Sequence, residues 1–225
     1  MCGASARKLS RATPGIVLRL PLQSFFATAV SRVAGPEKTT KEQILAGARI
    51  VFAKQGFHAT VKEIAKAAGL TSPSLVFWHF EDKDQLLMEV ATLSSPFSHI
   101  AALLERGPTE SISEWLEEVA QCYLEGYRDS VERQIFLQIV GIAPSTPALR
   151  AMLSKQLTDT ISNQLTKIIA RGQRSGLLRA NADPEFLAQS FLGTLYALIT
   201  RWEVEGSLPW TEDVIVRQLV DGLLP

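Results

Sequence analysis

The chain has few of the residues that form metal sites and disulfide frameworks. It contains two cysteines, far apart in sequence, and three histidines that each stand alone: Cys2, Cys122, His58, His79 and His99. A structural metal site needs several Cys or His ligands at short, repeated spacings. We therefore expect no metal and no cofactor, and the sparse cysteines predict a reduced, cytoplasmic setting.

Long apolar runs and catalytic patterns are also missing from the sequence. No stretch of about eighteen apolar residues lacks a charge, so we expect no segment that spans a membrane. There is no Ser/His/Asp ordering, no glycine-rich phosphate loop and no run of alternating polar and apolar residues typical of a strand. These absences argue against an enzyme and predict an all-α fold.

Acidic residues are absent from residues 1–36, which hold five basic residues and three prolines. The apolar stretch "GIVLRLPLQSFFATAV" is similar to a targeting segment, but Arg19 and Pro21 interrupt it. The composition favours a disordered basic extension over a targeting segment, and we expect residues 1–36 to be dispensable for folding.

The net charge of zero conceals an uneven distribution along the chain. Residues 1–90 hold 12 Lys and Arg against 7 Asp and Glu, whereas residues 91–225 hold 11 against 16. A basic N-terminal part joined to an acidic remainder indicates that the first part meets a polyanion.

Signals for helix starts recur from residue 39 onward. Capping-box spacing occurs at Thr40-x-x-Gln43, Thr60-x-x-Glu63, Asp82-x-x-Gln85 and Ser111-x-x-Glu114. A capping residue precedes proline at Ser72-Pro73, Thr146-Pro147 and Asp183-Pro184. With the apolar periodicity, these signals predict about nine helices, at roughly 40–55, 60–68, 72–80, 82–105, 111–129, 131–142, 147–175, 184–204 and 211–223.

The second and third predicted helices are short and are joined by a turn at Gly69. This arrangement is typical of a helix-turn-helix, whose second helix anchors one face on its own domain and presents the other to the DNA major groove. In this helix, inward positions are expected for Val76, Phe77 and Phe80, and outward ones for Ser74, Leu75, Trp78 and His79.

A series of short motifs runs in order through residues 40–87: Thr40-x-x-x-Ile44-Leu45, Phe52-Ala53, Gly56-Phe57, Thr60-Val61-x-x-Ile64-Ala65, Ala68-Gly69 and Phe77-x-His79-Phe80-x-x-Lys83-x-x-Leu86. Together they resemble the N-terminal domain of the TetR family of bacterial repressors. The resemblance implies a helix-turn-helix DNA-binding domain over residues 37–83. It also implies a larger helical domain for ligand binding and dimerisation over residues 84–225.

The residues that we expect to contact DNA lie in this first domain: Thr60, Lys62, Ser72, Ser74, Leu75, Phe77, Trp78, His79 and Lys83. A large aromatic on the exposed face of a short helix favours DNA contact over packing for Trp78. Lys83 is a cation in the first turn of a helix, where a nearby phosphate would stabilise it. Phe77 also fits the core, His79 also fits a packed position, and Lys62 also fits a solvated face.

Aromatic side chains and one methionine stand out in the middle of the chain. They fit either a helical core or the lining of a ligand cavity: Phe97, Trp115, Tyr123, Tyr127, Phe136 and Met152. Gln156 is a polar residue that could orient a ligand in such a cavity by a hydrogen bond. No cluster of Arg or Lys accompanies them, so the expected ligand is apolar or aromatic. The last two helices carry an excess of apolar residues, and the resemblance implies that these form a dimer interface: Phe191, Leu195, Ile199, Ile215 and Leu219.

The resemblance implies a transcriptional repressor that binds double-stranded operator DNA as a homodimer. A small-molecule effector would release it, and no membrane partner is expected. The alternative is an all-α small-molecule-binding protein or enzyme that has lost specific DNA binding.

Overall fold

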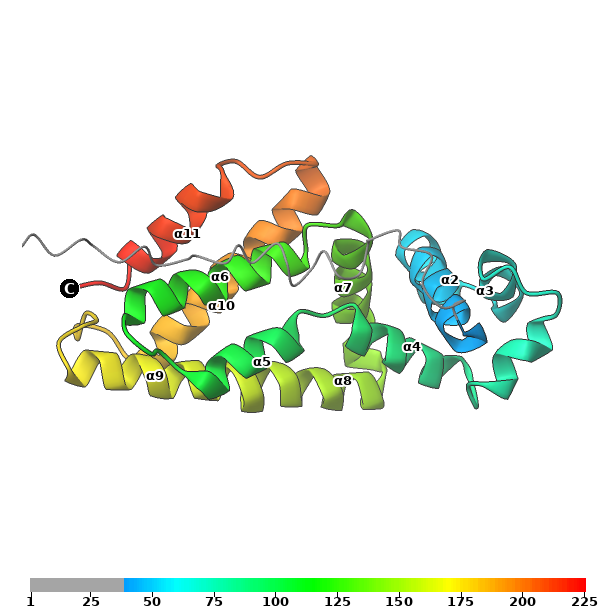
Figure 1. Ribbon diagram of the computed structural model, residues 1–225, viewed down its shortest axis with the longest axis horizontal. Helices are drawn as coiled ribbons and strands as arrows, with labels where there is room; N and C mark the ends of the chain where they lie inside the picture. Colours follow the sequence, from blue (N-terminus) through cyan, green and yellow to red (C-terminus); the bar gives the residue numbers. More distant parts are fainter. Residues whose placement is uncertain (1–38) are drawn as a thin grey trace, which may run out of the picture. The chain divides into compact units, whose positions relative to one another are not determined.

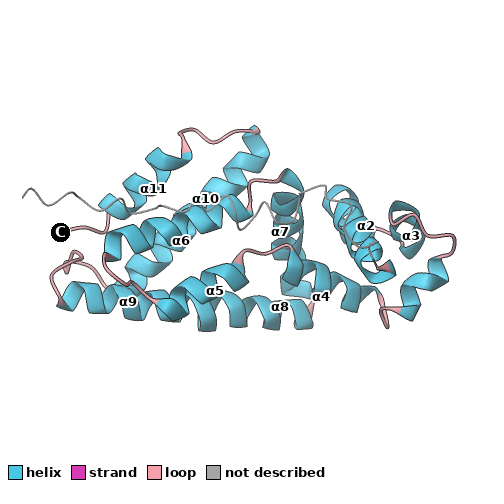
Figure 2. Cartoon of the chain, in the orientation of Figure 1, coloured by secondary structure: helices cyan, strands magenta, loops and turns pink. Residues whose placement is uncertain are grey.

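The computed structural model describes residues 39–225, and within this range every regular element is helical (Figures 1 and 2). The predicted all-α fold is confirmed. Residues 1–36, expected to be a basic extension, lie outside the described residues. Among the described residues, no single helix is long and apolar enough to cross a membrane, although two bent helix pairs pass on length and composition.

The predicted helix-turn-helix region consists of three main elements and one short turn. They are α2 (Thr40–Gln55), α3 (Val61–Ala67) and the 3₁₀ helix η3 (Pro73–Trp78), with a further 3₁₀ turn, η2 (Gly56–His58), between the first two. The remaining elements are α4 (Lys83–Leu93), α5 (Phe97–Arg106), α6 (Ile112–Gly126), α7 (Ser130–Ile142), η4 (Ala143–Ser145), α8 (Pro147–Ser154), the π-helical segment η5 (Lys155–Ser162), α9 (Asn163–Arg174), α10 (Pro184–Glu205) and α11 (Glu212–Asp221).

Most of the predicted caps are present, with one shifted by a residue. The Thr39 hydroxyl accepts the Glu42 N–H at 3.3 Å, and the Glu42 carboxylate accepts the Thr39 N–H at 2.8 Å. The box predicted at Thr40 and Gln43 is therefore wrong by one position, because a carboxylate is a stronger acceptor of a backbone N–H than an amide. The side chains of Thr60, Ser72, Asp82, Ser111 and Asp183 all cap as predicted, whereas that of Thr146 makes no capping bond.

Two long predicted helices are interrupted in the structure. The helix expected over 82–105 is two helices, α4 and α5, which meet at a bend of 48°. Pro96 lies at this break, where it has no N–H to donate and forces the preceding residue away from helical geometry. The helix expected over 147–175 contains the π-helical segment η5 between α8 and α9.

A continuous buried core joins the helix-turn-helix region to the helices that follow. In Figure 1, α2 and α3 lie together, and α2 also packs against α7 and α4. Gly47 allows the close approach of α2 and α3, since a Cβ there would lie 2.7 Å from the backbone nitrogen of Ala68. The domain boundary expected after residue 83 stays a prediction.

The guanidinium of Arg133 links three helices in this core. Its Nη1 donates to the carbonyls of Tyr127 at 2.8 Å and Arg128 at 2.7 Å, and its Nε donates to the Glu203 carboxylate at 3.0 Å. The same group lies over the Trp202 ring at 4.6 Å from its centroid. Arg133 is buried, so the end of α6, the start of α7 and the end of α10 depend on one charged side chain.

We predict that Arg133→Met lowers the free energy of unfolding by about 3 kcal/mol, because it leaves two carbonyls without their donor and the Glu203 carboxylate without its counter-charge. Denaturant unfolding measures this change. Arg201→Met is the matched control, since Arg201 forms an exposed ion pair with Glu205 on the same helix, and it should cost about 0.5 kcal/mol or less. Equal losses in the two variants would contradict the role assigned to Arg133.

Candidate functional site

The second element of the helix-turn-helix presents two large aromatic side chains to solvent. Trp78 is 84% exposed and Phe77 is 53% exposed, whereas Val76 and Phe80 are buried. The inward position expected for Phe77 is therefore wrong. The element is a 3₁₀ helix with three residues per turn, so Phe77 lies on the face of the exposed Ser74.

The residues around this face differ in their exposure and in how many of their hydrogen-bonding groups are free. His79 and Lys62 are exposed, and Leu75 is half-buried. The Thr60 hydroxyl, in contrast, donates to the Glu63 carboxylate at 2.8 Å and accepts the Glu63 N–H at 3.3 Å. The backbone N–H of Thr60, and then its hydroxyl, lower the pKa of Glu63 by stabilising its charged form. Thr60 thus holds the start of α3, and Ser72 likewise caps η3 by accepting the Ser74 N–H.

Lys83 has protein partners that the sequence did not indicate. Its ammonium donates to the carbonyl of Phe57 at 2.6 Å and to that of Ala59 at 3.3 Å. These bonds join the turn before α3 to the first turn of α4. An ammonium has three donors, so one N–H remains for a further acceptor. A phosphate contact by Lys83 stays a prediction.

A cavity of about 340 Å³ lies in the larger helical region, between α5, α6, α7, η5 and α10. Its lining is mainly apolar and aromatic: Phe97, Ile100, Tyr123, Phe136, Val140, Leu157, Thr158, Ile161, Gln189, Leu192, Gly193 and Tyr196. The Phe136 ring lies 6.2 Å from Phe97 and 5.8 Å from Tyr196, in edge-to-face arrangements. None of these lining residues is an acid, lysine, arginine or histidine, and burial raises the pKa of the Tyr123 phenol.

The structure places some of the expected ligand-site residues in this wall and others elsewhere. Phe97, Tyr123 and Phe136 line the cavity. Gln156 lines a smaller neighbouring cavity of about 210 Å³, which shares Phe97 and Ile161 with the first.

Three of the expected ligand-site residues line neither of these two cavities. Trp115 is a core residue whose indole N–H donates to the Leu103 carbonyl at 3.1 Å. Tyr127 is fully buried against Phe136, at 4.9 Å between ring centroids, and Met152 lies against Thr92. A ligand contact by these three residues stays a prediction.

Sequence reasoning missed the contribution of α10 to the cavity. Gln189, Leu192, Gly193 and Tyr196 lie in its wall, although α10 had been assigned to the dimer interface alone. The sequence did carry a signal for this contribution: the apolar residues of α10 cover more of the helix surface than a single contact face requires.

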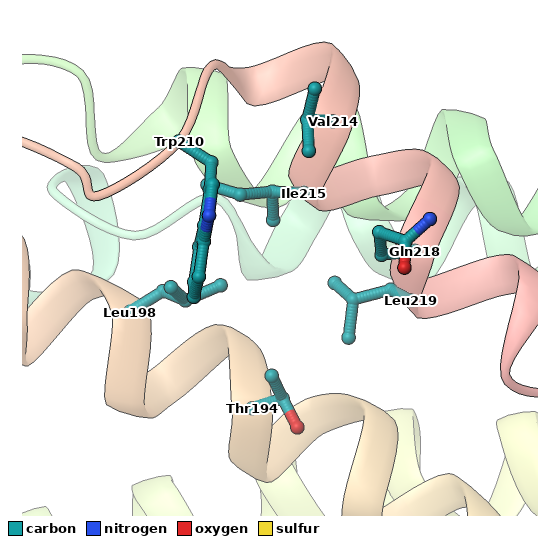
Figure 3. Close-up of a pocket in the computed structure, with 7 residues that line it drawn as sticks. All are labelled: Thr194, Leu198, Trp210, Val214, Ile215, Gln218 and Leu219. Atoms are coloured by element: carbon teal, nitrogen blue, oxygen red, sulfur yellow. The ribbon is translucent and has the colours of Figure 1, made fainter.

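The expected dimer residues are mostly core residues of the single chain. Phe191, Leu195, Ile199 and Ile215 are each 4% exposed or less in the single chain, so their role in a dimer interface stays a prediction. A groove of about 460 Å³ separates α10 and α11 (Figure 3). Its lining residues are Thr194, Leu198, Trp210, Val214, Ile215, Gln218 and Leu219.

Helix α7 contacts both the cavity and the helix-turn-helix region. Its Phe136 and Val140 line the cavity. Its Glu132 forms an ion pair with Arg49 of α2, and its Gln138 side chain lies where a Cβ at Gly56 would be. A change in the cavity wall at α7 can therefore reach α2 through direct contacts.

Groups that could carry chemistry are few in the part of the chain that the structure describes. Between residues 39 and 225 no cluster of three or more His, Cys, Asp or Glu side chains is placed to hold a metal ion. Burial, with Glu118 and Glu125 nearby, raises the pKa of the Cys122 thiol to about 11, so this thiol is protonated at neutral pH.

Comparison with known proteins finds one curated relative and solved structures of the same fold. The HTH-type transcriptional regulator AcrR of Shigella flexneri is 36% identical over 106 residues, which are 45% of this chain and 47% of the relative. The match thus spans about half the length of that relative. The structure of Salmonella enterica GusR is 25% identical, with a TM-score of 0.64, and covers 82% of this chain and 95% of its own. The SmeT–triclosan complex, at 20% identity and a TM-score of 0.67, shares the fold over 84% of this chain and 93% of that one.

Two family models match consecutive parts of the chain. The model of the bacterial regulatory proteins of the tetR family matches residues 44–90. The model of the tetracyclin-repressor-like C-terminal domain matches residues 107–222, which is more than half of the sequence. The first match falls on the helix-turn-helix region, and the second falls on the helical region that contains the cavity. The chain therefore belongs to the tetR family of bacterial regulatory proteins.

Proposed function

We propose that the chain is a transcriptional repressor that binds double-stranded operator DNA as a homodimer and leaves it when a small apolar or aromatic effector occupies the cavity. It would act in the cytoplasm, where its operator lies. The observation that carries the proposal is the exposed aromatic face of η3, since large apolar side chains gathered on a surface mark a binding site. In a helix-turn-helix, this face is the one that enters the major groove.

The proposed DNA contacts divide into two kinds. Phe77, Trp78 and their exposed neighbours Ser74 and His79 extend toward base edges and sugars, where they can distinguish sequences. Lys62, together with the remaining N–H of Lys83, would contact phosphates. These contacts add affinity for any sequence and release counterions.

We predict that Trp78→Ala reduces the preference for operator over unrelated DNA, because it removes the largest side chain from the groove-facing surface. Electrophoretic shift of the DNA that flanks the protein's own gene, with unrelated DNA as competitor, measures the preference. Leu177→Ala is the control, since Leu177 is also an exposed apolar residue, 54% accessible, at the end of α9. A uniform loss of affinity in Trp78→Ala would assign Trp78 to positioning instead.

Lys62→Ala should weaken binding about equally for all sequences and reduce the slope of log affinity against log salt by roughly one unit. Lys155→Ala, which removes an exposed lysine from η5, should leave the slope unchanged. Lys83→Ala is less informative here because it also removes the bonds to Phe57 and Ala59, so its melting temperature must be measured alongside. Identical slopes for Lys62→Ala and the parent would exclude a phosphate contact by Lys62.

The groove between α10 and α11 is the proposed dimer interface. Trp210 is 59% exposed and Val214 is 42% exposed beside it, so both can be covered by a second copy. A two-fold axis there would pair the α10–α11 helices and set two η3 helices apart by roughly 34–36 Å, one turn of DNA.

We expect Val214→Asp to give folded monomers in sedimentation, because an unpaired charge would be buried only in the dimer. The single chain should tolerate the change, since Val214 is partly exposed there. Leu93→Asp, at an exposed apolar residue of α4, should remain dimeric. A Val214→Asp protein that stays dimeric would place the interface elsewhere.

The effector would act by stabilising an arrangement of α7 and α2 that no longer fits the operator. The shift can be no larger than the difference in the effector's affinity for the two arrangements. SmeT, which shares the fold, is known in complex with the small molecule triclosan. The ion pair of Glu132 with Arg49 lies on the route from the cavity to α2.

We predict that Gly193→Leu blocks effector-induced release and spares DNA binding, because the new side chain fills the cavity. A Cβ at Gly193 meets no atom within 4 Å, so the change starts without a backbone clash. Gly141→Leu is the matched control: it is also free of contacts within 4 Å and is exposed on α7, outside the cavity. Normal release from Gly193→Leu, measured by electrophoretic shift with effector, would move the effector site away from this cavity.

A further inference from the structure

We propose that the effector is an uncharged aromatic molecule carrying a hydrogen-bond donor, as in a phenol, and that Gln189 recognises this donor. The inference rests on the proposed function and adds the chemical class of the ligand and the residue that selects it.

The absence of charge in the cavity wall sets the charge of the ligand. No acidic, lysine, arginine or histidine residue lines the cavity of about 340 Å³ or its neighbour of about 210 Å³, within the chain as described. A charged ligand would lose its water there without gaining a counter-charge, which is costly. The site therefore favours a neutral molecule.

The ring geometry of the wall favours an aromatic body. Phe136 meets Phe97 with an angle of 81° between ring planes and meets Tyr196 with an angle of 74°. A further aromatic ring in the cavity can add edge-to-face contacts of the same kind to these rings, which line its wall. A cavity of about 340 Å³ is within the size range of sites for small organic ligands.

Gln189 supplies a hydrogen-bond acceptor to this body. Its amide nitrogen donates to the hydroxyl of Ser162 at 2.7 Å, and Ser162 is buried on η5. Gln189 is itself exposed, and its amide oxygen accepts no hydrogen bond from another residue between 39 and 225, so a ligand that displaces water can donate to it. An O–H or N–H of the ligand satisfies that oxygen, whereas an ether or a carboxylate does not.

Two hydroxyls of the neighbouring cavity can also accept hydrogen bonds. The hydroxyl of Thr92 donates its proton to the Met88 carbonyl at 2.9 Å, and that of Thr160 donates to the Lys155 carbonyl at 3.2 Å. With their protons used in this way, both hydroxyls present lone pairs to the cavity. A larger effector that extends past Phe97 can therefore donate to these two hydroxyls.

Three probes of similar shape test the inference on the full chain: 4-phenylphenol, 4-methoxybiphenyl and biphenyl-4-carboxylate. Calorimetric titration without DNA should give a roughly tenfold higher affinity for the phenol than for the methyl ether, and no binding of the carboxylate. Gln189→Met should reduce affinity for the phenol to that for the ether and leave the ether unchanged. Gln156→Met, in the neighbouring cavity, should preserve the tenfold ratio.

Several results would overturn the inference. These are equal affinities for phenol and ether, preferential binding of the carboxylate, no binding of any probe, or a ratio that depends on Gln156 and not on Gln189. Circular dichroism of both variants shows whether they fold as the parent does. Ser162→Ala, which frees the amide, provides a second test and should also lower the ratio. Electrophoretic shift separates the two proposals: Gln189-dependent phenol binding without DNA release would overturn the proposed function alone.

Discussion

Burial of the Arg133 guanidinium is the constraint on which the arrangement around α7 depends. A buried charge must find partners, and this one finds the carbonyls that end α6 and a carboxylate on α10. Both helices are thereby fixed at the N-terminal end of α7. Along the same helix, Glu132 reaches α2, and Phe136 forms part of the cavity wall. Because α7 contacts both α2 and the cavity, the bonds that fix α7 also fix the position of the helix-turn-helix relative to the cavity.

Local features of the fold could be predicted from the sequence, because the residues that decide them lie within four positions of each other. The caps at Thr60 and Asp183 are examples. The helix over 40–55 was predicted correctly, but its capping residue was misplaced by one position, since Thr39 and Thr40 both have a plausible partner three positions on. The break before α5 was missed although Pro96 marks it, because the apolar pattern continues on both sides.

The candidate site was harder to predict because periodicity shows which residues are apolar but not which neighbour covers them. Leu195 and Ile199 of α10 face the core of their own chain, whereas Trp210, just before α11, and Val214, within α11, remain exposed, although all four are apolar residues of the same C-terminal region. Phe77 was placed inward on the assumption of α-helical geometry, and the tighter 3₁₀ turn moves it outward. Gln189 carried no signal of its own, since its importance lies in a bond to Ser162, 27 residues away.

The π-helical segment η5 explains a spacing in the sequence. From residue 149 to residue 169 an apolar residue recurs at every fourth position: Leu149, Leu153, Leu157, Ile161, Leu165 and Ile169. In an unbroken α-helix each step of four overshoots a full turn by about 40°, so such a row would spiral around the helix. The wider turns of η5 take up this overshoot between α8 and α9. Five residues of the row are therefore buried in the core, and only Leu157, within η5, is exposed. Deleting one residue within η5 would rotate the apolar row of α9 out of register with that of α8.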